Sequence, residues 1–231
     1  MIRVASYNMR KAIGTDRRRK PERTLEVLRE LDADVIALQE ADRRFGTRAS
    51  AIPLHLIAEH SDYKPVPFEG RSGSLGWHGN ALLVRKNVDI LRKELVHLPS
   101  LEPRGAVMAE ICLGDEEVRV IGMHLDLSGL WRRRQAHAIL SHVRSRGDDM
   151  PTVLMGDLNE WSVRGGCLRE FNEHCRVADC GRSFHVRRPV ARLDRIMVTD
   201  GLSIDACGVH QSATAAKASD HFPVWAQLSR I

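Results

Sequence analysis

The stretch VLMGDLNEW, residues 153–161, joins an apolar run directly to a Gly-Asp-Leu-Asn sequence. The run predicts a buried β-strand, and Asp157 and Asn159 follow where the strand would end. A surface turn would explain these residues, because Gly, Asn and Asp are common in turns. Alternatively, the strand directs two polar side chains into a functional site. The rest of the chain distinguishes these interpretations.

The composition is that of a globular protein. The chain has 231 residues, of which 43% are hydrophobic and 28% charged. A chain of this length can bury a core without disulfides or metals, so we expect a single domain over residues 1–231. The formal charge of +5 and the pI near 9.2 are consistent with an anionic substrate but do not require one.

The cysteine and apolar patterns bear on location. Five cysteines form no CxxC pair and are an odd number, so we expect free thiols in a reducing compartment. No apolar run approaches the roughly 18 residues of a membrane span. We therefore expect a soluble cytoplasmic protein, most simply a monomer, without membrane insertion.

Eight short β-rich runs recur along the chain, several of them continuously apolar, as in strands covered on both faces. They are Ile2–Tyr7, Asp34–Leu38, Asn80–Val84, Val107–Leu113, Val118–Met123, Thr152–Met155, Arg195–Val198 and Val224–Leu228.

Helical patterns are fewer and scattered between these runs. One helix is expected to begin at Pro21, and others to cover Trp131–Val143 and Cys167–His174. Many strands with few helices predict an α/β (α+β) fold. We expect two packed mixed β-sheets flanked by helices, since simple βαβ alternation would need more helices.

Polar residues of the kinds used in catalysis stand at six of the predicted strand edges. A single acid at a strand end means little, but a repeated pattern is typical of a site built on a rigid sheet. In chain order the residues are Asn8, Gln39, Glu40, His124, Asp126, Asp157, Asn159, Asp194, Asp220 and His221.

The chemistry of this set points to phosphoester hydrolysis. Carboxylates and amides without paired cysteines favour Mg²⁺, with Mn²⁺ as the alternative, over structural zinc. Two histidines could face an anion, and Asp194 could orient one of them. A cation, an acid that holds water and histidines around a phosphate would together make a phosphoester hydrolase.

The chain resembles the endonuclease/exonuclease/phosphatase superfamily. The resemblance rests on eight motifs in the family's order, spanning almost the whole chain, and it implies a DNase I-like four-layer sandwich. The motifs are SYN (6–8), ALQE (37–40), GNALLV (79–84), PRGAV (103–107), GMHLD (122–126), GDLNEW (156–161), LDRI (193–196) and SDHFPV (219–224).

The resemblance implies a metal group and a catalytic group. Glu40 would be the main metal ligand, with Asn8 close by and Asp220 on the metal side. Asp157 would hold or deprotonate the attacking water, and Asn159 would hydrogen-bond a phosphate oxygen. This interpretation answers the opening question, because in-line attack needs water and phosphoryl group held together.

The histidines would contact the phosphate. His221 would stabilise charge on the phosphoryl oxygens while Asp194 fixes its tautomer. His124 would also contact phosphate, although a structural role is the alternative. Asn80 would orient a substrate oxygen or brace the site, and Arg104 would be a substrate contact or an internal ion pair.

One position departs from the family's abasic-site nuclease branch, which has an acid two residues after the first-motif Asn. Here Arg10 occupies that position. The departure argues against a two-metal site of the kind found in that branch and against abasic-site repair. Arg10 would grip an anionic substrate, or it is simply an exposed charge.

The substrate is the least determined feature. We expect a phosphate ester, with a nucleic-acid phosphodiester as the leading candidate. A phospholipid, sphingomyelin or inositol phosphate is the alternative substrate. Two other classes stay open: a catalytically inactive phosphate- or nucleic-acid-binding module, and a zinc hydrolase using His124, Asp126, Asp157 and His221. The number of metals, mono- or diester preference and oligomeric state are left undetermined by the sequence.

Overall fold

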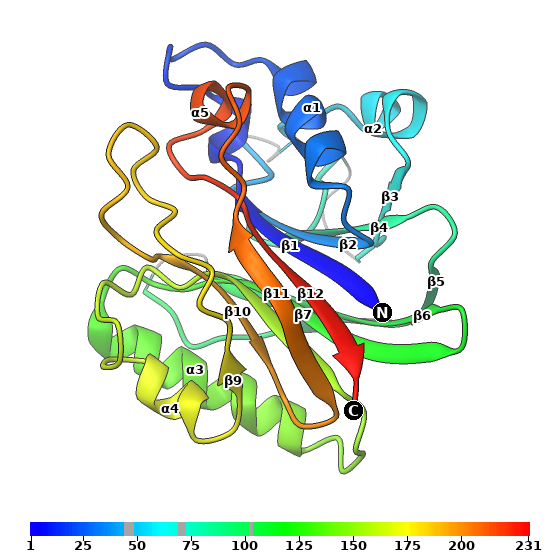
Figure 1. Ribbon diagram of the computed structural model, residues 1–231, viewed down its shortest axis with the longest axis vertical. Helices are drawn as coiled ribbons and strands as arrows, with labels where there is room; N and C mark the ends of the chain where they lie inside the picture. The colour runs from blue at the N-terminus through cyan, green and yellow to red at the C-terminus, as the bar shows by residue number, and fades with distance from the viewer. Residues whose placement is uncertain (44–48, 69–72, 102–103) are drawn as a thin grey trace.

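The computed structural model describes residues 1–43, 49–68, 73–101 and 104–231. Within these residues two six-stranded mixed β-sheets pack face to face, and helices cover the outer face of each sheet (Figure 1). This is the four-layer arrangement expected from the sequence. Of the helices in the described ranges, none is both long and apolar enough to cross a membrane.

The first sheet is built around the N-terminal strand. Its order is β11-β12-β1-β2-β4-β3, and β1 runs parallel to β2 but antiparallel to β12. The strands are β1 (Ile2–Asn8), β2 (Val35–Gln39), β3 (Tyr63–Pro65), β4 (Ala81–Arg85), β11 (Leu202–Val209) and β12 (Val224–Arg230).

The second sheet contains the strand of the GDLN motif. Its order is β5-β6-β7-β8-β10-β9, and β8 pairs parallel with β7 and antiparallel with β10. The strands are β5 (Asp89–Val96), β6 (Gly105–Leu113), β7 (Glu116–His124), β8 (Thr152–Asp157), β9 (Arg176–Val177) and β10 (Asp194–Val198).

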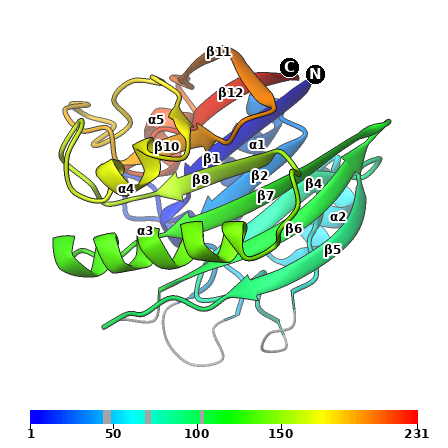
Figure 2. The ribbon, with the colours of Figure 1, turned by 90° about the horizontal axis from the view of Figure 1, so that it is seen from below.

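The helices form the two outer layers (Figure 2). Residues of α1 (Pro21–Leu31), α2 (Leu54–His60) and α5 (Ala215–Ala218) share a core with the first sheet, and a short 3-10 turn, η1 (Arg10–Ala12), follows β1. Residues of α3 (Gly129–Arg144) and α4 (Leu168–Asn172) share a core with the second sheet.

The main core lies between the sheets. It is formed by small and branched apolar side chains from both sheets, among them Val4 and Val35 from the first and Val107 and Val153 from the second. Strands that also carry helices on their outer side are apolar on both faces, and all residues of β2 are buried. This explains the continuous apolar runs of the sequence.

Strand direction brings the polar strand ends to one edge. In the first sheet, Asn8 ends β1 beside Gln39 at the end of parallel β2. In the second, Asp157 at the end of β8 faces both His124 of β7 and Asp194 of β10. Ser219, just before Asp220 and His221, is held at the same edge, because its Oγ donates a 2.7 Å hydrogen bond to the backbone oxygen of Asn8.

The structure confirms the predicted fold class and all eight predicted strands, with boundaries that agree within two residues. The three predicted helices also form. The elements that we did not predict are β3, β5, β9, β11, α2, α5 and η1. The five cysteines are free thiols, as expected.

Candidate active site

Asp157 is positioned by a glycine that lets two strands approach closely. A Cβ atom on Gly156 would lie 1.9 Å from the backbone oxygen of Met123 in the neighbouring strand β7. Only glycine avoids this clash, so the residue before Asp157 is fixed by packing as well as by any turn preference. Asp157 itself is still a strand residue, which rules out the simple surface-turn interpretation.

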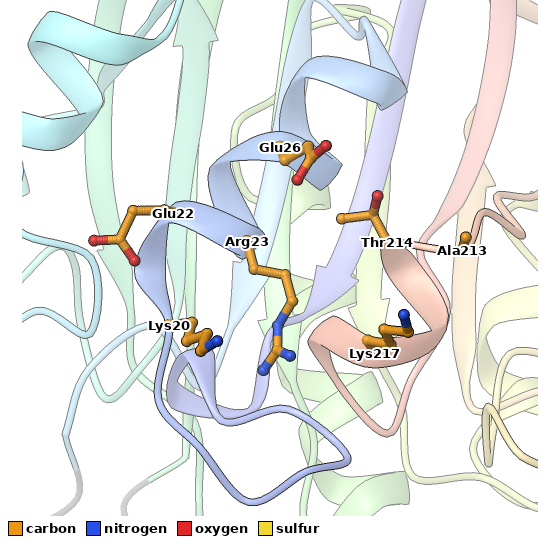
Figure 3. Close-up of a pocket in the computed structure, with 7 residues that line it drawn as sticks. All are labelled: Lys20, Glu22, Arg23, Glu26, Ala213, Thr214 and Lys217. Carbon is orange, nitrogen blue, oxygen red and sulfur yellow. The ribbon is translucent and has the colours of Figure 1, made fainter.

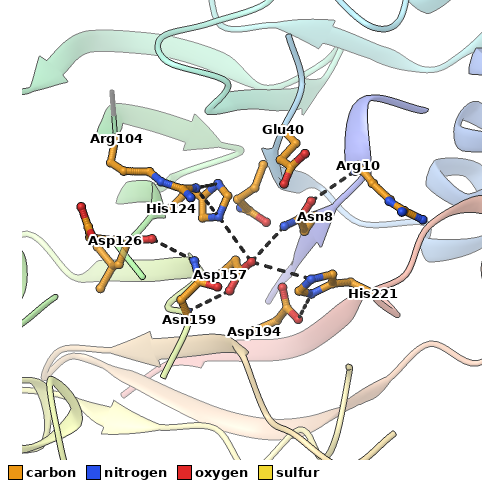
Figure 4. Close-up of polar contacts among 12 residues, drawn as sticks. Asn8, Arg10, Glu40, Arg104, His124, Asp126, Asp157, Asn159, Asp194 and His221 are labelled. Carbon is orange, nitrogen blue, oxygen red and sulfur yellow. Dashed lines mark hydrogen bonds and ion pairs between the residues drawn. The ribbon is translucent and has the colours of Figure 1, made fainter. Parts of the chain in front are cut away.

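The Asp157 carboxylate lies at the centre of the site (Figure 4). It is buried, with 2% of its surface exposed. Its Oδ2 accepts a 2.9 Å hydrogen bond from Asn8 Nδ2, which joins the two sheets, and its Oδ1 accepts a 2.9 Å bond from the Asn159 backbone N–H. Its Oδ2 also lies 3.4 Å from His124 Nε2 and 3.9 Å from His221 Nε2.

His221 is a buried imidazolium. Its Nδ1 donates a 2.9 Å hydrogen bond to Asp194 Oδ2, while Nε2 faces Asp157. Burial opposes the charge, but the nearby carboxylates of Asp194 and Asp157 outweigh it and raise the pKa of His221 to about 10. His221 therefore carries two ring protons at neutral pH, so Asp194 fixes the orientation of the ring and not, as expected, its tautomer.

His124 is held in the opposite protonation state. Burial lowers the pKa of His124 to about 3, and the charge of Arg104 acts in the same direction, against the pull of Asp157. Arg104 Nη1 lies 2.8 Å from His124 Nδ1 and 2.6 Å from Nε2. The neutral ring has one N–H and one accepting nitrogen, and Arg104 can donate to the accepting one. Arg104 therefore contacts a site histidine directly.

Asn159 and Asn80 differ in what their amides contact. Asn159 Nδ2 donates to the backbone oxygen of Leu125 at 2.9 Å, which fixes the side chain beside Asp157. Asn80 is fully buried, and its Nδ2 donates to the Gly105 backbone oxygen at 3.0 Å. This bond ties Asn80 to the residue after Arg104, while its Oδ1 has no hydrogen-bond partner among the described residues, so both expected roles of Asn80 stay predictions.

The residues expected to bind a metal lie close to basic side chains. Glu40 directly follows β2 and pairs with Lys11. Asp220 Oδ2 lies 3.2 Å from Arg10 Nε, and Asn8 Oδ1 accepts a 3.2 Å bond from the Arg10 backbone N–H. Arg10 is therefore at the site and is paired with an acid, and its contact with a substrate stays a prediction.

A divalent cation fits this region by the chemistry of its donors. Among the described residues, Asp157, Asp194 and His221 form the one group of three potential ligands whose atoms lie within 4.8 Å of one another. The Asp194 Oδ1 atom is buried and has no hydrogen-bond partner within the described ranges. The imidazolium of His221 has no free lone pair for a cation, so the carboxylate and amide oxygens around it are the better donors.

Strained backbone is concentrated at the site. Lys11, Glu40 and Asn159 have φ angles of +56°, +52° and +50°, in the left-handed region that non-glycine residues rarely adopt. Each costs of order 1 kcal/mol and persists where surrounding structure enforces it. The three residues follow three different strands, β1, β2 and β8.

Three residues at the site were missed by sequence reasoning. Ser183 Oγ donates a 2.5 Å hydrogen bond to Asp194 Oδ2 and so helps to fix that carboxylate. Phe184 packs on His221 with ring centroids 4.8 Å apart, and exposed Trp161 packs edge-on against Phe184 at 6.1 Å. The position of Trp161 directly after GDLNE indicated a place beside the site. Nothing in the sequence singled out Ser183 and Phe184.

Comparisons with known proteins identify the family of this chain. Residues 5–221 match the profile of the Endonuclease/Exonuclease/phosphatase family. The uncharacterized protein YbhP of Escherichia coli (strain K12) is 28% identical over 98% of this chain and 96% of its own length.

Solved structures share the fold. An endonuclease/exonuclease/phosphatase from Bacteroides vulgatus has a TM-score of 0.79 at 18% identity, covering 100% of this chain and 99% of its own. The mannosyl-6-phosphatase Bt3783 of Bacteroides thetaiotaomicron has a TM-score of 0.75 at 21% identity (99% and 100% covered). D. rerio TDP2 complexed with a single-strand DNA product has a TM-score of 0.74 at 16% identity, covering 99% of this chain and 98% of its own. At these identities the likeness establishes the fold alone.

Proposed function

Because the chain belongs to the Endonuclease/Exonuclease/phosphatase family, whose members are phosphoester hydrolases, we propose that it is a Mg²⁺-dependent phosphodiesterase. The observation that carries the proposal is the central Asp157 carboxylate, set between one charged and one neutral histidine. A base, a cationic group and a neutral donor converge there, which suits in-line attack of water on a phosphoryl group.

The proposed step uses Asp157 as the base. The carboxylate takes a proton from water as the water oxygen bonds to phosphorus, and the bond to the leaving oxygen breaks on the opposite side. The His221 imidazolium stabilises the negative charge that grows on the phosphoryl oxygens. The second amide hydrogen of Asn159 would donate to the same oxygens, and the neutral ring of His124, beside Asp157, would contact them as well.

The family typically depends on a divalent metal, and we propose Glu40 and Asn8, with Asp220 nearby, as its protein ligands. Glu40 and Asn8 stand at adjacent strand ends and offer oxygen atoms, which Mg²⁺ prefers. The cation would neutralise charge on the phosphate. Lys11 and Arg10 pair with these acids, so their positions would change when the cation binds.

Two features support a nucleic-acid substrate. Exposed Trp161 and half-buried Phe184 extend from His221 to the surface, and such flat side chains stack on bases. The TDP2 structure of this fold contains a DNA product. The alternative is a phosphatase of sugar or inositol phosphates, since the fold also occurs in a mannosyl-6-phosphatase.

A hydrolysis panel tests the function. Purified protein is assayed in Mg²⁺, Mn²⁺, Zn²⁺ or EDTA on single-stranded DNA, RNA, bis-p-nitrophenyl phosphate, inositol phosphates, sugar phosphates and phospholipid vesicles. We expect EDTA-sensitive cleavage of nucleic acid in Mg²⁺, and a higher Mg²⁺ requirement in Glu40→Gln. Activity with zinc alone would favour a zinc hydrolase. Binding of a substrate without turnover would favour a catalytically inactive binding module.

Replacing Trp161 tests the substrate class. In Trp161→Ala, the KM for a dinucleotide should rise about 5- to 100-fold, because base stacking on an aromatic side chain is lost. The KM for a diester without a flat group, such as glycerophosphorylglycerol, should not change. Trp131→Ala, on helix α3, is the matched control. Equal KM values for the dinucleotide in wild type and Trp161→Ala would remove this residue from the substrate site.

A further inference from the structure

Two basic cavities of the described structure have arginines that play no part in the histidine site. One, of about 450 Å³, lies between α1 and α5 and is shown in Figure 3. Its cations are accompanied by Glu22 and Glu26, and its central Arg23 already donates two 3.1 Å hydrogen bonds to Asp16. The other, of about 510 Å³, lies beside β10, and three arginines, Arg164, Arg192 and Arg195, contribute to its lining.

Arg195 is the exceptional residue of the second cavity. Only 5% of its surface is exposed, yet it forms no ion pair with a described residue. One hydrogen bond of its guanidinium is present in the described structure, from Nη1 to the backbone oxygen of Asp194 at 3.3 Å. A guanidinium has five N–H donors, and a buried charge without a counter-charge is costly. Burial accordingly lowers the pKa of Arg195.

Neither acid that lines the cavity forms an ion pair with Arg195, although the charge of Asp194 favours the guanidinium through space. The Asp194 carboxylate is directed to Ser183 and His221, in the catalytic group. Asp179 pairs with Arg192 and is itself largely exposed. Arg195 thus has no ion-pair partner among the described residues, and with three arginines and two aspartates the cavity is positive overall.

Arg164 adds a second free cation. It is exposed on the segment that leads from Asn159 to α4, and within the described part of the chain its side chain has no hydrogen-bond or ion-pair partner. It lines the cavity together with Asn172, an amide that can donate to an oxyanion. The cavity therefore has a buried cation at its base and an exposed cation at its rim.

We propose that this cavity binds a phosphate-type oxyanion, held by Arg195 and Arg164. The planar guanidinium donates pairs of hydrogen bonds that match the oxygens of phosphate, and such charge-assisted bonds are stronger than those between neutral groups. The inference does not rest on the proposed phosphodiesterase activity, because it concerns binding at residues outside the catalytic group.

The position of the cavity is compatible with two sources of the bound oxyanion. Arg195 pairs across the sheet with Gly156, so it is one residue removed from Asp194 and opposite the neighbour of Asp157. The occupant is therefore either a second phosphate group of the substrate or a free phosphate. Both share the same recognition chemistry.

Binding of inorganic phosphate tests the proposal. Titration calorimetry in EDTA compares wild type with Arg195→Gln, Arg195→Lys and Arg164→Gln. We expect phosphate affinity to fall at least about tenfold in Arg195→Gln, less in Arg195→Lys, and several-fold in Arg164→Gln. Arg169→Gln, on the exposed side of α4, is the matched control.

Arg164→Gln keeps the test valid if the buried substitution prevents folding, because Arg164 is exposed. Unchanged phosphate affinity in Arg164→Gln, and in Arg195→Gln if it folds, would overturn the proposal, whatever the hydrolytic activity. A higher KM in Arg164→Gln for a dinucleotide with a terminal phosphate, but not for one without it, would identify a substrate phosphate. Unchanged KM values with weaker phosphate binding would identify free phosphate.

Discussion

Asp157 faces two histidines in opposite protonation states. Carboxylates on both ring nitrogens hold His221 as an imidazolium, whereas burial and Arg104 hold His124 neutral. The difference comes from surroundings alone, because the two side chains are chemically identical. A site with one base, one cation and one neutral donor can bind a phosphate anion and activate water at the same pH.

The two protonation states can be observed directly. In the protein treated with EDTA at pH 7, ring-nitrogen NMR should show two protonated nitrogens in His221 and one in His124. In Asp194→Asn the pKa of His221 should fall toward that of ordinary histidine, because one counter-charge is lost. A neutral His221 in the wild-type protein would contradict the account.

At this scale the sequence predicted which residues gather, because it showed which ones stand at strand ends. It did not predict their partners. Lys11 reaches Glu40, and Arg10 reaches Asp220, through left-handed backbone just after β1. Long side chains on such segments point where the local φ and ψ angles direct them, and a single sequence does not reveal those angles. The roles of these residues stay predictions.

At the scale of the element, the strand of the GDLN motif depends on Gly156, which has no side chain. Gly156 allows β7 and β8 to pair up to His124 and Asp157, so packing and site geometry have a common cause. A larger residue would separate the strands at the point where the catalytic group is assembled.

Gly156→Ala should therefore destabilise the protein by about 2–3 kcal/mol or more, since the new methyl group cannot fit beside Met123. Urea unfolding measures the change. Gly129→Ala, at the start of α3 where a Cβ meets only an ordinary contact, should not destabilise. Equal stabilities of Gly156→Ala and wild type would show that the close strand approach is not required.

The unpredicted elements share physical causes. β5 is an edge strand whose charged residues hide the alternation that marks a half-buried strand. β11 contains a register shift between Ile204 and Ala206, which interrupts its period of two. β9 has two residues and α5 four, too few to show any period. The buried central strands were predictable because both faces are apolar.

At the scale of the whole molecule, the sheets share one core and one site. Apolar side chains of both sheets meet in the central layer, and the Asn8–Asp157 hydrogen bond joins the sheets at the functional edge. Separating the sheets would expose the core and take from the buried Asp157 carboxylate its Asn8 partner. We therefore propose that residues 1–231 form one cooperative domain.

Cooperative unfolding is the expected consequence. Tryptophan fluorescence and far-ultraviolet circular dichroism should follow the same single transition in urea, because neither sheet keeps a complete core alone. Two separated transitions would show that the sheets, or other parts of the chain, fold independently.

The central claim is that Asp157 activates water in a phosphoester hydrolase, and single-turnover kinetics of Asp157→Asn test it most directly. The best substrate of the panel is used in saturating Mg²⁺, with exposed Asp115→Asn in the β6–β7 turn as the matched control. We predict that Asp157→Asn lowers the rate of the chemical step by about 10²- to 10⁴-fold while substrate affinity and the control rate are kept. A rate in Asp157→Asn close to that of wild type would contradict the account.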